Sequence, residues 1–446
     1  MESSENQVPL AEQKLEIKEE PRIVAMGASA GGLEALKEFF DNVPADCQYT
    51  FVVVQHLSPD YKSLMAELLA KNTSMPIYEI THNMEIKKGC IYLIPPKKNM
   101  TILNGKLMLT NKPSGHDLNL PIDIFFRSLA QESKEKSICI ILSGTGSDGT
   151  SGARAIKEAG GMVMVQDPLQ AKFDGMPRSA LNTGLVDYTL PVEQLPTELI
   201  HFVDNPKSNG ATENQIEQDK ETLNRIIHQI RNITQFDFRY YKRPTLVRRI
   251  ARRISINKLH NQKEYLDFLF ENITEVHTLA REFLIGVTKF FRDTYVWERL
   301  ENKIIPDIIR SKSEGELLKL WCVGTSTGEE AYSMAILLSE ELERQGKTLE
   351  VKIFATDVAD NSLEIGSRGV YAESIIANVS QNRLNKFFIQ KKDEYQVVDS
   401  LRRMVIFSQH DILRDPPFNK MDLAICRNLL IYYEPRAQRK IIGLLH

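Results

Sequence analysis

The sequence predicts an α/β protein: a doubly wound parallel-sheet domain, then a small all-α domain and a second α/β domain. Three observations support this prediction. In the first half, apolar runs of strand length lead into glycine-containing turns and helical patterns. Residues 221–290 then show mainly helical periodicity, and from residue 318 onward the alternation of strand, turn and helix returns.

Length and composition limit the class of protein. A chain of 446 residues can form two or three domains, and a formal net charge of -3 with 42% hydrophobic residues gives no reason to expect nucleic acid or membrane partners. There is neither a run of about twenty apolar residues nor an apolar signal core, so we expect a cytoplasmic protein without direct membrane insertion. The cysteines lack metal-ligand spacing and are expected to be reduced, mostly buried thiols: Cys47, Cys90, Cys139, Cys322 and Cys426.

Composition shifts divide the chain into five parts. Residues 1–20 are polar and acidic and are expected to form a loose tail. The first α/β domain is predicted for residues 21–203, and residues 204–220, polar with Pro and Gly early on, form a linker. The helical domain is predicted for residues 221–290 and the second α/β domain for residues 291–446.

The stretch around Ser29 organises the first domain. The apolar run of residues 23–26 is followed by small residues and then by a helical pattern, which predicts a strand, a tight turn and a helix. Gly27 and Gly31 permit a sharp turn and leave the hydroxyl of Ser29 uncovered at the positive end of the new helix. Ser29 is therefore either a nucleophile or an ordinary N-cap.

Two more polar residues follow predicted buried strands. Residues 49–55 form a continuous apolar run that ends at His56, and residues 137–142 lead into the glycine-rich turn that contains Asp148. Ligands bind at the carboxyl edge of such sheets, where Ser29 also lies. Two alternatives remain open: Asp148 as an N-cap, and its glycine-rich turn as a phosphate-binding loop, although the turn has no Walker-type lysine.

Taken together, these three side chains suggest a hydrolytic triad. His56 would accept the proton of Ser29, and Asp148 would orient the imidazole and stabilise its charged form. An oxyanion hole would come from loop amides near Thr145 and Gly146, or from those behind Ser29. The chain order Ser, His, Asp differs from that of α/β-hydrolases, so the Gly-x-Ser-x-Gly pattern does not indicate that fold.

Four ordered motifs resemble the catalytic domain of the chemotaxis methylesterase family, CheB. They are residues 27–32, 54–56, 142–149, and 165–168 with 175–180, and the resemblance covers residues 21–203. It implies hydrolysis of glutamate methyl esters and deamidation of glutamines on chemoreceptors, with Ser29, His56 and Asp148 in the triad positions. The family usually carries a receiver domain ahead of this one, whereas only residues 1–20 precede the first strand here, so phosphorylation control in cis is not expected.

A basic segment marks the helical domain. Residues 239–258 contain eight basic residues and no acidic ones. Arg248 with Arg252, and Arg249 with Arg253, share a helix face and repel each other, which favours an acidic partner. A solvated surface helix is the alternative, and a nucleic-acid face lacks any accompanying aromatic or RNA-binding signature.

The second α/β domain repeats the strand, turn and helix plan. Residues 318–323 lead into a turn with Gly324 and Gly328, and residues 350–356 end at Asp357. A glycine turn and a carboxylate at neighbouring strand ends suit a nucleoside, because the backbone approaches closely and the acid accepts from ribose hydroxyls. The alternative is that Asp357 only caps the next helix.

Residues 288–292, 324–335 and 427–433 resemble the chemotaxis receptor methyltransferase family, CheR, and the resemblance runs from about residue 220 to the C-terminus. It implies a Rossmann-like domain that takes S-adenosylmethionine as methyl donor and receptor glutamates as acceptors. By motif position, Thr288 and Arg292 lie near the donor's methionine part and the acceptor. The remaining assignments are Glu329 or Glu330 for the donor's amino-acid end, Asp357 for the ribose, and Asn428 with Leu429 for the adenosine region.

Two further expectations follow from this resemblance. Residues 386–405 match a small antiparallel insertion on which receptor tails dock in some family members. The chain stops inside a helix, before the turn and the last two strands that normally close the fold. We therefore expect an exposed apolar edge strand, with poor stability or weak donor affinity.

The leading interpretation is a bifunctional enzyme that adds and removes methyl esters on cytoplasmic helices of chemoreceptors, meeting them with the face at Arg248 to Arg253. The alternative is a receptor-binding signalling scaffold whose methyltransferase half is inactive.

Overall fold

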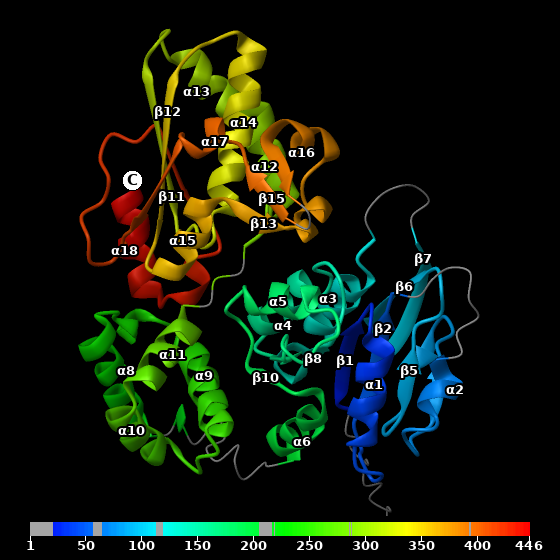
Figure 1. Ribbon diagram of the computed structural model, residues 1–446. Helices are drawn as coiled ribbons and strands as arrows, with labels where there is room; N and C mark the ends of the chain where they lie inside the picture. The colour runs from blue at the N-terminus through cyan, green and yellow to red at the C-terminus, as the bar shows by residue number, and fades with distance from the viewer. Residues whose placement is uncertain are drawn as a thin grey trace, which may run out of the picture.

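The computed structural model describes residues 21–56, 65–112, 119–204, 216–217, 219–284, 286, 288–391 and 394–446. The predicted tail, residues 1–20, and most of the predicted linker, residues 204–220, lie outside this description. Figure 1 shows three parts: a first α/β domain, a helical domain, and a second α/β domain above it that ends at the C-terminus.

The first domain is built on a seven-stranded sheet in the order β10-β9-β8-β1-β2-β5-β3, and all its neighbouring strands run parallel. A separate antiparallel sheet has the order β4-β7-β6. The strands are β1 Ile23–Ala28, β2 Thr50–Gln55, β3 Ile77–Glu79, β4 Met84–Glu85, β5 Ile91–Leu93, β6 Lys98–Leu103, β7 Lys106–Asn111, β8 Ile138–Ile141, β9 Met162–Gln166 and β10 Tyr188–Leu190.

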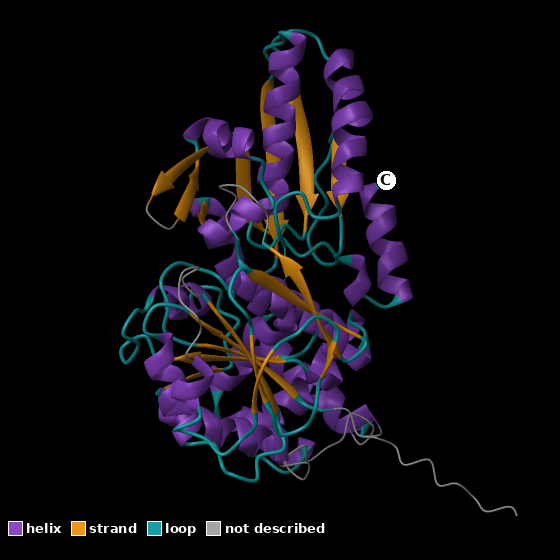
Figure 2. Cartoon of the chain, turned by 90° about the vertical axis from the view of Figure 1, so that its right-hand side faces the viewer, coloured by secondary structure: helices purple, strands orange, loops and turns teal. Residues whose placement is uncertain are grey.

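Helices cover both faces of this sheet (Figure 2). Successive residues of β1 point to opposite faces, so Ala25 packs in one buried cluster with residues of α3, α4 and α5, and Met26 packs in another with residues of α1, α2 and α6. This confirms the doubly wound prediction. The helices are α1 Gly32–Asp41, α2 Met65–Leu69, α3 Pro121–Ser133, η1 Lys134–Lys136, α4 Thr150–Glu158, α5 Gly175–Leu181, η2 Val192–Gln194 and α6 Leu195–Asp204.

The helical domain consists of α8 Lys220–Thr234, η3 Phe238–Tyr240, α9 Arg243–Ile256, α10 Gln262–Glu271 and α11 Ile273–Phe283. Its apolar residues share one buried cluster with Trp321 and Val323 of the second α/β domain. The helical domain and the second α/β domain are therefore joined by a common core.

The basic face of α9 does not lie open as expected. Arg249 donates to the carbonyl of Glu282, and Arg253 is buried and paired with Glu275 at 2.6 Å. Arg252 forms an ion pair with Asp187 of the first domain. The prediction of an open basic face is therefore wrong for these three arginines, because acids already pair with Arg252 and Arg253 and a backbone carbonyl accepts from Arg249; Arg248 stays exposed.

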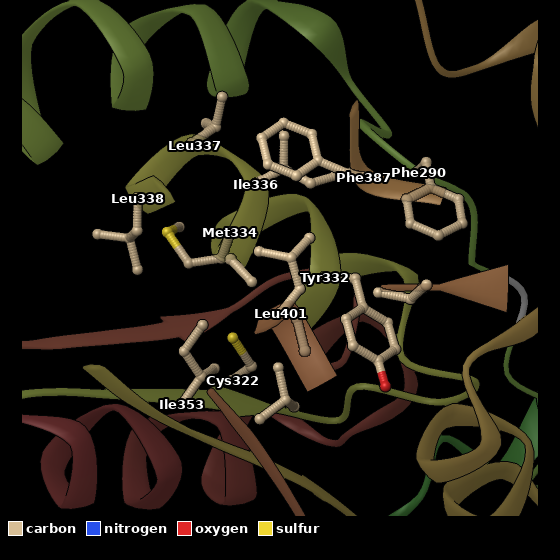
Figure 3. Close-up of a cluster of buried hydrophobic side chains, with 14 of the residues drawn as sticks. Phe290, Cys322, Tyr332, Met334, Ile336, Leu337, Leu338, Ile353, Phe387 and Leu401 are labelled. Atoms are coloured by element: carbon tan, nitrogen blue, oxygen red, sulfur yellow. The ribbon is translucent and has the colours of Figure 1, made fainter. Parts of the chain in front are cut away.

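The second α/β domain has a four-stranded parallel sheet in the order β16-β12-β11-β17. Side chains from β11, β12 and α14 meet in its core, among them Cys322, Ile353 and Met334 (Figure 3). The strands are β11 Leu317–Val323, β12 Glu350–Asp357, β16 Val405–Gln409 and β17 Leu423–Cys426, and the helices are α12 Thr294–Arg299, η4 Leu300–Ile304, α13 Ile305–Ser311, α14 Glu329–Gln345, α15 Asp360–Arg368, α17 Asp399–Arg402, η6 Leu430–Tyr432 and α18 Pro435–Leu445.

The predicted antiparallel insertion is present and larger than expected. It forms a three-stranded sheet in the order β13-β15-β14, with β13 Val370–Ala372 before the predicted range, β14 Phe388–Lys391 and β15 Glu394–Val397. Helix η5 Glu373–Ala377 and α16 Gln381–Phe387 connect it. Within the described residues, β17 pairs only with β11 and is an edge strand.

Candidate active sites

Ser29 directly follows β1, and its amide donates to the carbonyl of Ser143 at 3.0 Å. The N-cap of α1 is Gly31, at φ 71°, and no side chain caps this helix. The N-cap alternative for Ser29 is therefore wrong. The loop after β8 passes so close that a Cβ added to Gly144 would lie 2.9 Å from the Cβ of Ser29, which explains a glycine at that position.

His56 follows β2, and its imidazole reaches the acid that follows β8. Its Nε2 lies 2.7 Å from Oδ2 of Asp148, and 35% of the His56 side chain is exposed. Because β8, β1 and β2 are neighbours in the parallel sheet, Asp148, Ser29 and His56 all lie at its carboxyl edge. Among the described residues, no hydrogen bond joins Ser29 Oγ to His56, as is common before substrate binds.

Asp148 is buried and held by backbone donors. Its carboxylate accepts from the amides of Ile122 at 3.0 Å, Asp123 at 2.9 Å and Gly149 at 2.8 Å. Two of these amides belong to the first turn of α3, whereas the N-cap of α4 is Gly149, without a side-chain cap. Asp148 is thus not the cap of its own following helix, and both carboxylate oxygens are fixed beside His56.

A second buried acid, which the sequence did not single out, lies beside Asp148. Oδ1 of Asp123 accepts from the amide of Gly152 at 2.6 Å, and Oδ2 is buried without a partner in the described part of the chain. Burial, and then the charge of Asp148, raise the pKa of Asp123 to about 7. An acid inside the apolar run of residues 121–126 was the available signal.

The second site is a pocket at the carboxyl ends of β11, β12 and β17. Residues from the helical domain, Tyr241 and Phe283, close one side of it. Six of the seven residues predicted to bind the methyl donor line this pocket: Thr288, Arg292, Glu330, Asp357, Asn428 and Leu429.

Asp357 ends β12 and braces the glycine turn. Its Oδ2 accepts from the amide of Ser326 at 2.8 Å, and its Oδ1 accepts from the amide of Ala359 at 3.0 Å. Burial raises the pKa of Asp357. The N-cap of α15 is Ala359 without a side-chain cap, so Asp357 is not the N-cap of that helix. Its carboxylate oxygens retain the capacity to accept from a ligand hydroxyl.

The two neighbouring glutamates at the start of α14 point to different places. Glu330 lines the pocket and pairs with Arg427 at 2.9 Å; burial raises its pKa to about 7 against the opposing effect of Arg427. Glu329 does not line this pocket. Its carboxylate accepts from the hydroxyl of Thr327 at 2.6 Å and lies 3.6 Å from Arg154 of the first domain.

The mouth of the pocket is contacted by the first domain. Arg292 lies 3.0 Å from Glu158, the last residue of α4. Arg427 donates to the backbone carbonyl of Arg292 at 2.5 Å and to the carboxylate of Asp293 at 2.9 Å. The two arginines therefore lie together at this mouth, and each is paired with a carboxylate.

Three stretches of the chain match known protein families. Residues 24–199 match the CheB methylesterase family, residues 221–284 match the CheR methyltransferase all-alpha domain, and residues 286–446 match the CheR methyltransferase SAM binding domain. A putative protein-glutamate methylesterase/protein-glutamine glutaminase from Leptospira interrogans is 33% identical over 183 residues, which cover 41% of this chain and 95% of the relative. The chain belongs to the CheB methylesterase family.

The CheB domain is followed by both domains of a CheR methyltransferase, so the hybrid architecture inferred from the motifs is confirmed. A chemotaxis protein methyltransferase from Borreliella burgdorferi is 29% identical over 229 residues, covering 50% of this chain and 81% of the relative. An uncharacterized 104.1 kDa protein from Rhodobacter capsulatus is 37% identical over 404 residues, covering 86% of this chain. The chain spans 42% of the length of that protein.

Several pocket residues of the CheR part were not assigned roles from the sequence. Arg427 stands beside the predicted Asn428, and Tyr241 and Phe283 come from the helical domain. The tyrosine and phenylalanine carried no signal, because their position depends on how the helical domain packs on the sheet.

Within the described ranges, no cluster of three or more potential metal-ligating side chains occurs. The described helices include none with the length and apolar character needed to span a bilayer.

Proposed function

We propose that this chain hydrolyses glutamate methyl esters, and deamidates glutamines, on chemoreceptors with its CheB domain, and methylates receptor glutamates with its CheR domain. The 2.7 Å contact of His56 with Asp148, beside Ser29 at the edge of the sheet, is the observation that carries the first activity. The proposed domains, 21–203, 221–290 and 291–446, together enclose all of the residues involved.

In the esterase reaction Ser29 Oγ attacks the ester carbonyl while His56 takes its proton. Asp148 occupies Nε2 of the imidazole, so Nδ1 is the nitrogen left for Ser29. His56 then protonates the ester oxygen as its bond to the carbonyl carbon breaks and methanol leaves; when the substrate is a glutamine, it protonates the amide nitrogen and ammonia leaves. Water, deprotonated by the same imidazole, releases the carboxylate and restores Ser29.

The negative oxygen of the tetrahedral intermediate needs donors near Ser29. The loop from Ser143 to Ser147 passes the serine, and in the described chain the fold's backbone hydrogen bonds do not use the amides of Thr145 and Gly146. We assign these two amides to the oxyanion hole. One such donor typically contributes about 3 to 4 kcal/mol to transition-state stabilisation.

The esterase assignment is tested by following methanol release from a methylated receptor. Ser29→Ala should lower the rate by about 10⁴-fold or more, because the nucleophile is lost while the fold is kept. Ser133→Ala, at the far end of α3, is the matched control and should match wild type. Equal rates for wild type and Ser29→Ala would exclude the triad.

The residues that line the pocket of the CheR part suit S-adenosylmethionine. Gly324, at φ 69°, lets the backbone approach a ligand, Asp357 offers acceptors for ribose hydroxyls, and Glu330 offers a carboxylate for a cationic amino group. Thr288 and Arg292 line the same pocket, near the methionine part and the acceptor, and Asn428 with Leu429 take the adenosine region. The donor supplies a methyl group on a positively charged sulfur.

The residues of the chain position the acceptor. A glutamate carboxylate is already ionised near neutral pH, so no strong base is required and alignment provides most of the acceleration. Arg292 and Arg427 would hold the acceptor carboxylate at the mouth of the pocket. The buried surroundings of Glu330 and Asp357 help to exclude water.

Calorimetry with S-adenosylmethionine and labelled methyl transfer test this second assignment. Asp357→Ala should weaken donor binding by about tenfold or more, because it removes the ribose acceptor and the brace of Ser326. Asp360→Asn, an exposed change three residues later, is the control. Unchanged binding by Asp357→Ala would refute the assignment.

This proposal places the protein in the cytoplasm, where receptor helices are accessible. It is favoured over a non-catalytic signalling scaffold, because the ordered contacts of His56 and Asp148, and a formed donor pocket, serve catalysis.

A further inference from the structure

A cavity of about 600 Å³ lies between the CheB domain and the CheR sheet. We call it the interdomain cleft. In Figure 1 the small sheet of β13 and β15 faces α4 and α5 across it. One wall carries Gly146, Arg154 and Arg178 of the CheB domain, and the other carries Thr288, Arg368 and Lys391 of the CheR part.

The interdomain cleft borders both active sites. At one end, Gly146 belongs to the loop that passes Ser29 and carries the proposed oxyanion amides. At the other end, Thr288 lines the interdomain cleft and also the donor pocket. A chain segment lying in the interdomain cleft would therefore be in reach of both reactions.

The charge of this surface is predominantly positive. Its lining includes five basic residues against two acidic ones, and one of the acids, Glu329, is buried and faces Arg154 at 3.6 Å. The side chain of Arg178 is 58% exposed and that of Arg368 is 68% exposed; within the described residues, each pairs with one exposed acid a turn earlier in the chain, Asp174 or Glu364. Such pairs are weak, so both arginines remain available to an acidic ligand.

We propose that one acidic helix of the receptor binds in the interdomain cleft and serves as the substrate of both active sites. This inference rests on the proposed function and deepens it. The occupant is a helix that carries glutamates or their methyl esters, because a positive surface flanked by two glutamate-modifying sites complements it. The sequence placed the receptor-binding surface on the arginines of α9, but Asp187, Glu275 and Glu282 already engage three of them. The proposal places that surface in the interdomain cleft instead.

Cross-domain kinetics test the proposal on the full chain. Arg178→Glu lies on the CheB wall and should raise the KM of methyl transfer, whereas Arg368→Glu lies on the CheR wall and should raise the KM of ester hydrolysis. We expect about fivefold or more in each case, with kcat and donor affinity unchanged. Lys136→Glu and Arg439→Glu, exposed charges away from the interdomain cleft, are the matched controls.

The same variants are titrated with a fluorescent synthetic helix of the receptor that carries glutamates. Wild type and the controls should bind it equally, and both cleft variants should bind it more weakly. If each variant raised the KM only of the reaction catalysed by the domain that carries the substitution, the chain would have two separate docking sites, and the proposal would be overturned. Unchanged peptide affinity would also overturn it. Wild type that binds the helix but modifies it in neither direction would refute the proposed function while the interdomain cleft stands.

Discussion

The carboxylate of Glu158, at the end of α4 in the CheB domain, lies 3.0 Å from the guanidinium of Arg292 in the CheR part. Burial, and then the charge of Glu158, raise the pKa of Tyr432, another residue of the donor pocket. One domain thus places a glutamate carboxylate where the other would receive a substrate glutamate. In the proposed reaction, the acceptor carboxylate competes with Glu158 for Arg292.

Glu158→Gln should therefore increase methyl transfer. Partly exposed ion pairs contribute about 1 kcal/mol or less, so we expect a two- to fivefold rise in kcat/KM for receptor, at most. Labelled methyl incorporation at limiting receptor measures it. Glu135→Gln, an exposed change in η1, is the control. A lower rate in Glu158→Gln would show that the carboxylate assists the reaction.

Donor binding should depend on pH through Glu330, whose pKa is about 7. The group is neutral below that pH and anionic above it, so attraction for the donor's cationic amino group grows as pH rises. We expect affinity to increase by about tenfold from about pH 6 to about pH 8. Calorimetry on Glu330→Gln should show weaker binding with a flatter profile. An unchanged slope in this variant would assign the titration to another group.

Asp123 should make stability fall with rising pH. Its carboxyl has a pKa of about 7 in the folded chain, above the ordinary value of 3.8. Between about pH 4 and pH 7 the folded state therefore binds more protons than the unfolded state. The stabilisation from the protonated carboxyl is full below about pH 4 and is lost as the pH rises through about 7. Asp123→Asn should reduce the difference between thermal midpoints at acidic and neutral pH, relative to the exposed control Asp46→Asn. An identical difference in both variants would contradict this.

The CheB domain and the helical domain share a buried ionic network. Lys157 lies 2.5 Å from Asp187 and 2.9 Å from Glu282, and Asp187 also pairs with Arg252. Burial lowers the pKa of Lys157. Burial raises the pKa of Glu282, but the charges of Lys157 and Arg252 outweigh this effect and lower that pKa to about 2. These charges link two domains that are separated by the linker.

Lys157→Met should destabilise the chain, because Asp187 and Glu282 lose a buried partner. Removing one member of a buried pair typically costs about 3 to 5 kcal/mol. Scanning calorimetry should show a lower midpoint and a separate transition for the CheB domain. The exposed control Lys134→Met should behave as wild type. A single, unshifted transition would mean that the network does not couple the domains.

The catalytic edge of the first sheet was predictable from local patterns. Ser29, His56 and Asp148 each follow a continuous apolar run, and parallel strands bring their carboxyl ends to one edge regardless of loop length. The same argument placed Asp357 at the edge of the second sheet. The N-cap alternatives for Ser29 and Asp148 could be rejected only with the structure, because Gly31 and Gly149 occupy the cap positions.

Contacts between domains were not predictable. The charges of Arg249 and Arg252 suggested an open basic face, but their partners Glu282 and Asp187 approach only through tertiary packing. The choice between Glu329 and Glu330 had the same origin. Adjacent helical residues point about 100° apart, so one faces the donor pocket and the other faces the CheB domain.

The proposed function requires one chain both to add and to remove the same methyl group. The direct test supplies receptor and S-adenosylmethionine with a labelled methyl group, and follows label on the receptor and label released as methanol. Wild type should methylate and then release label, whereas Ser29→Ala should accumulate labelled receptor without releasing methanol. Equal accumulation and equal methanol release by wild type and Ser29→Ala would contradict the claim.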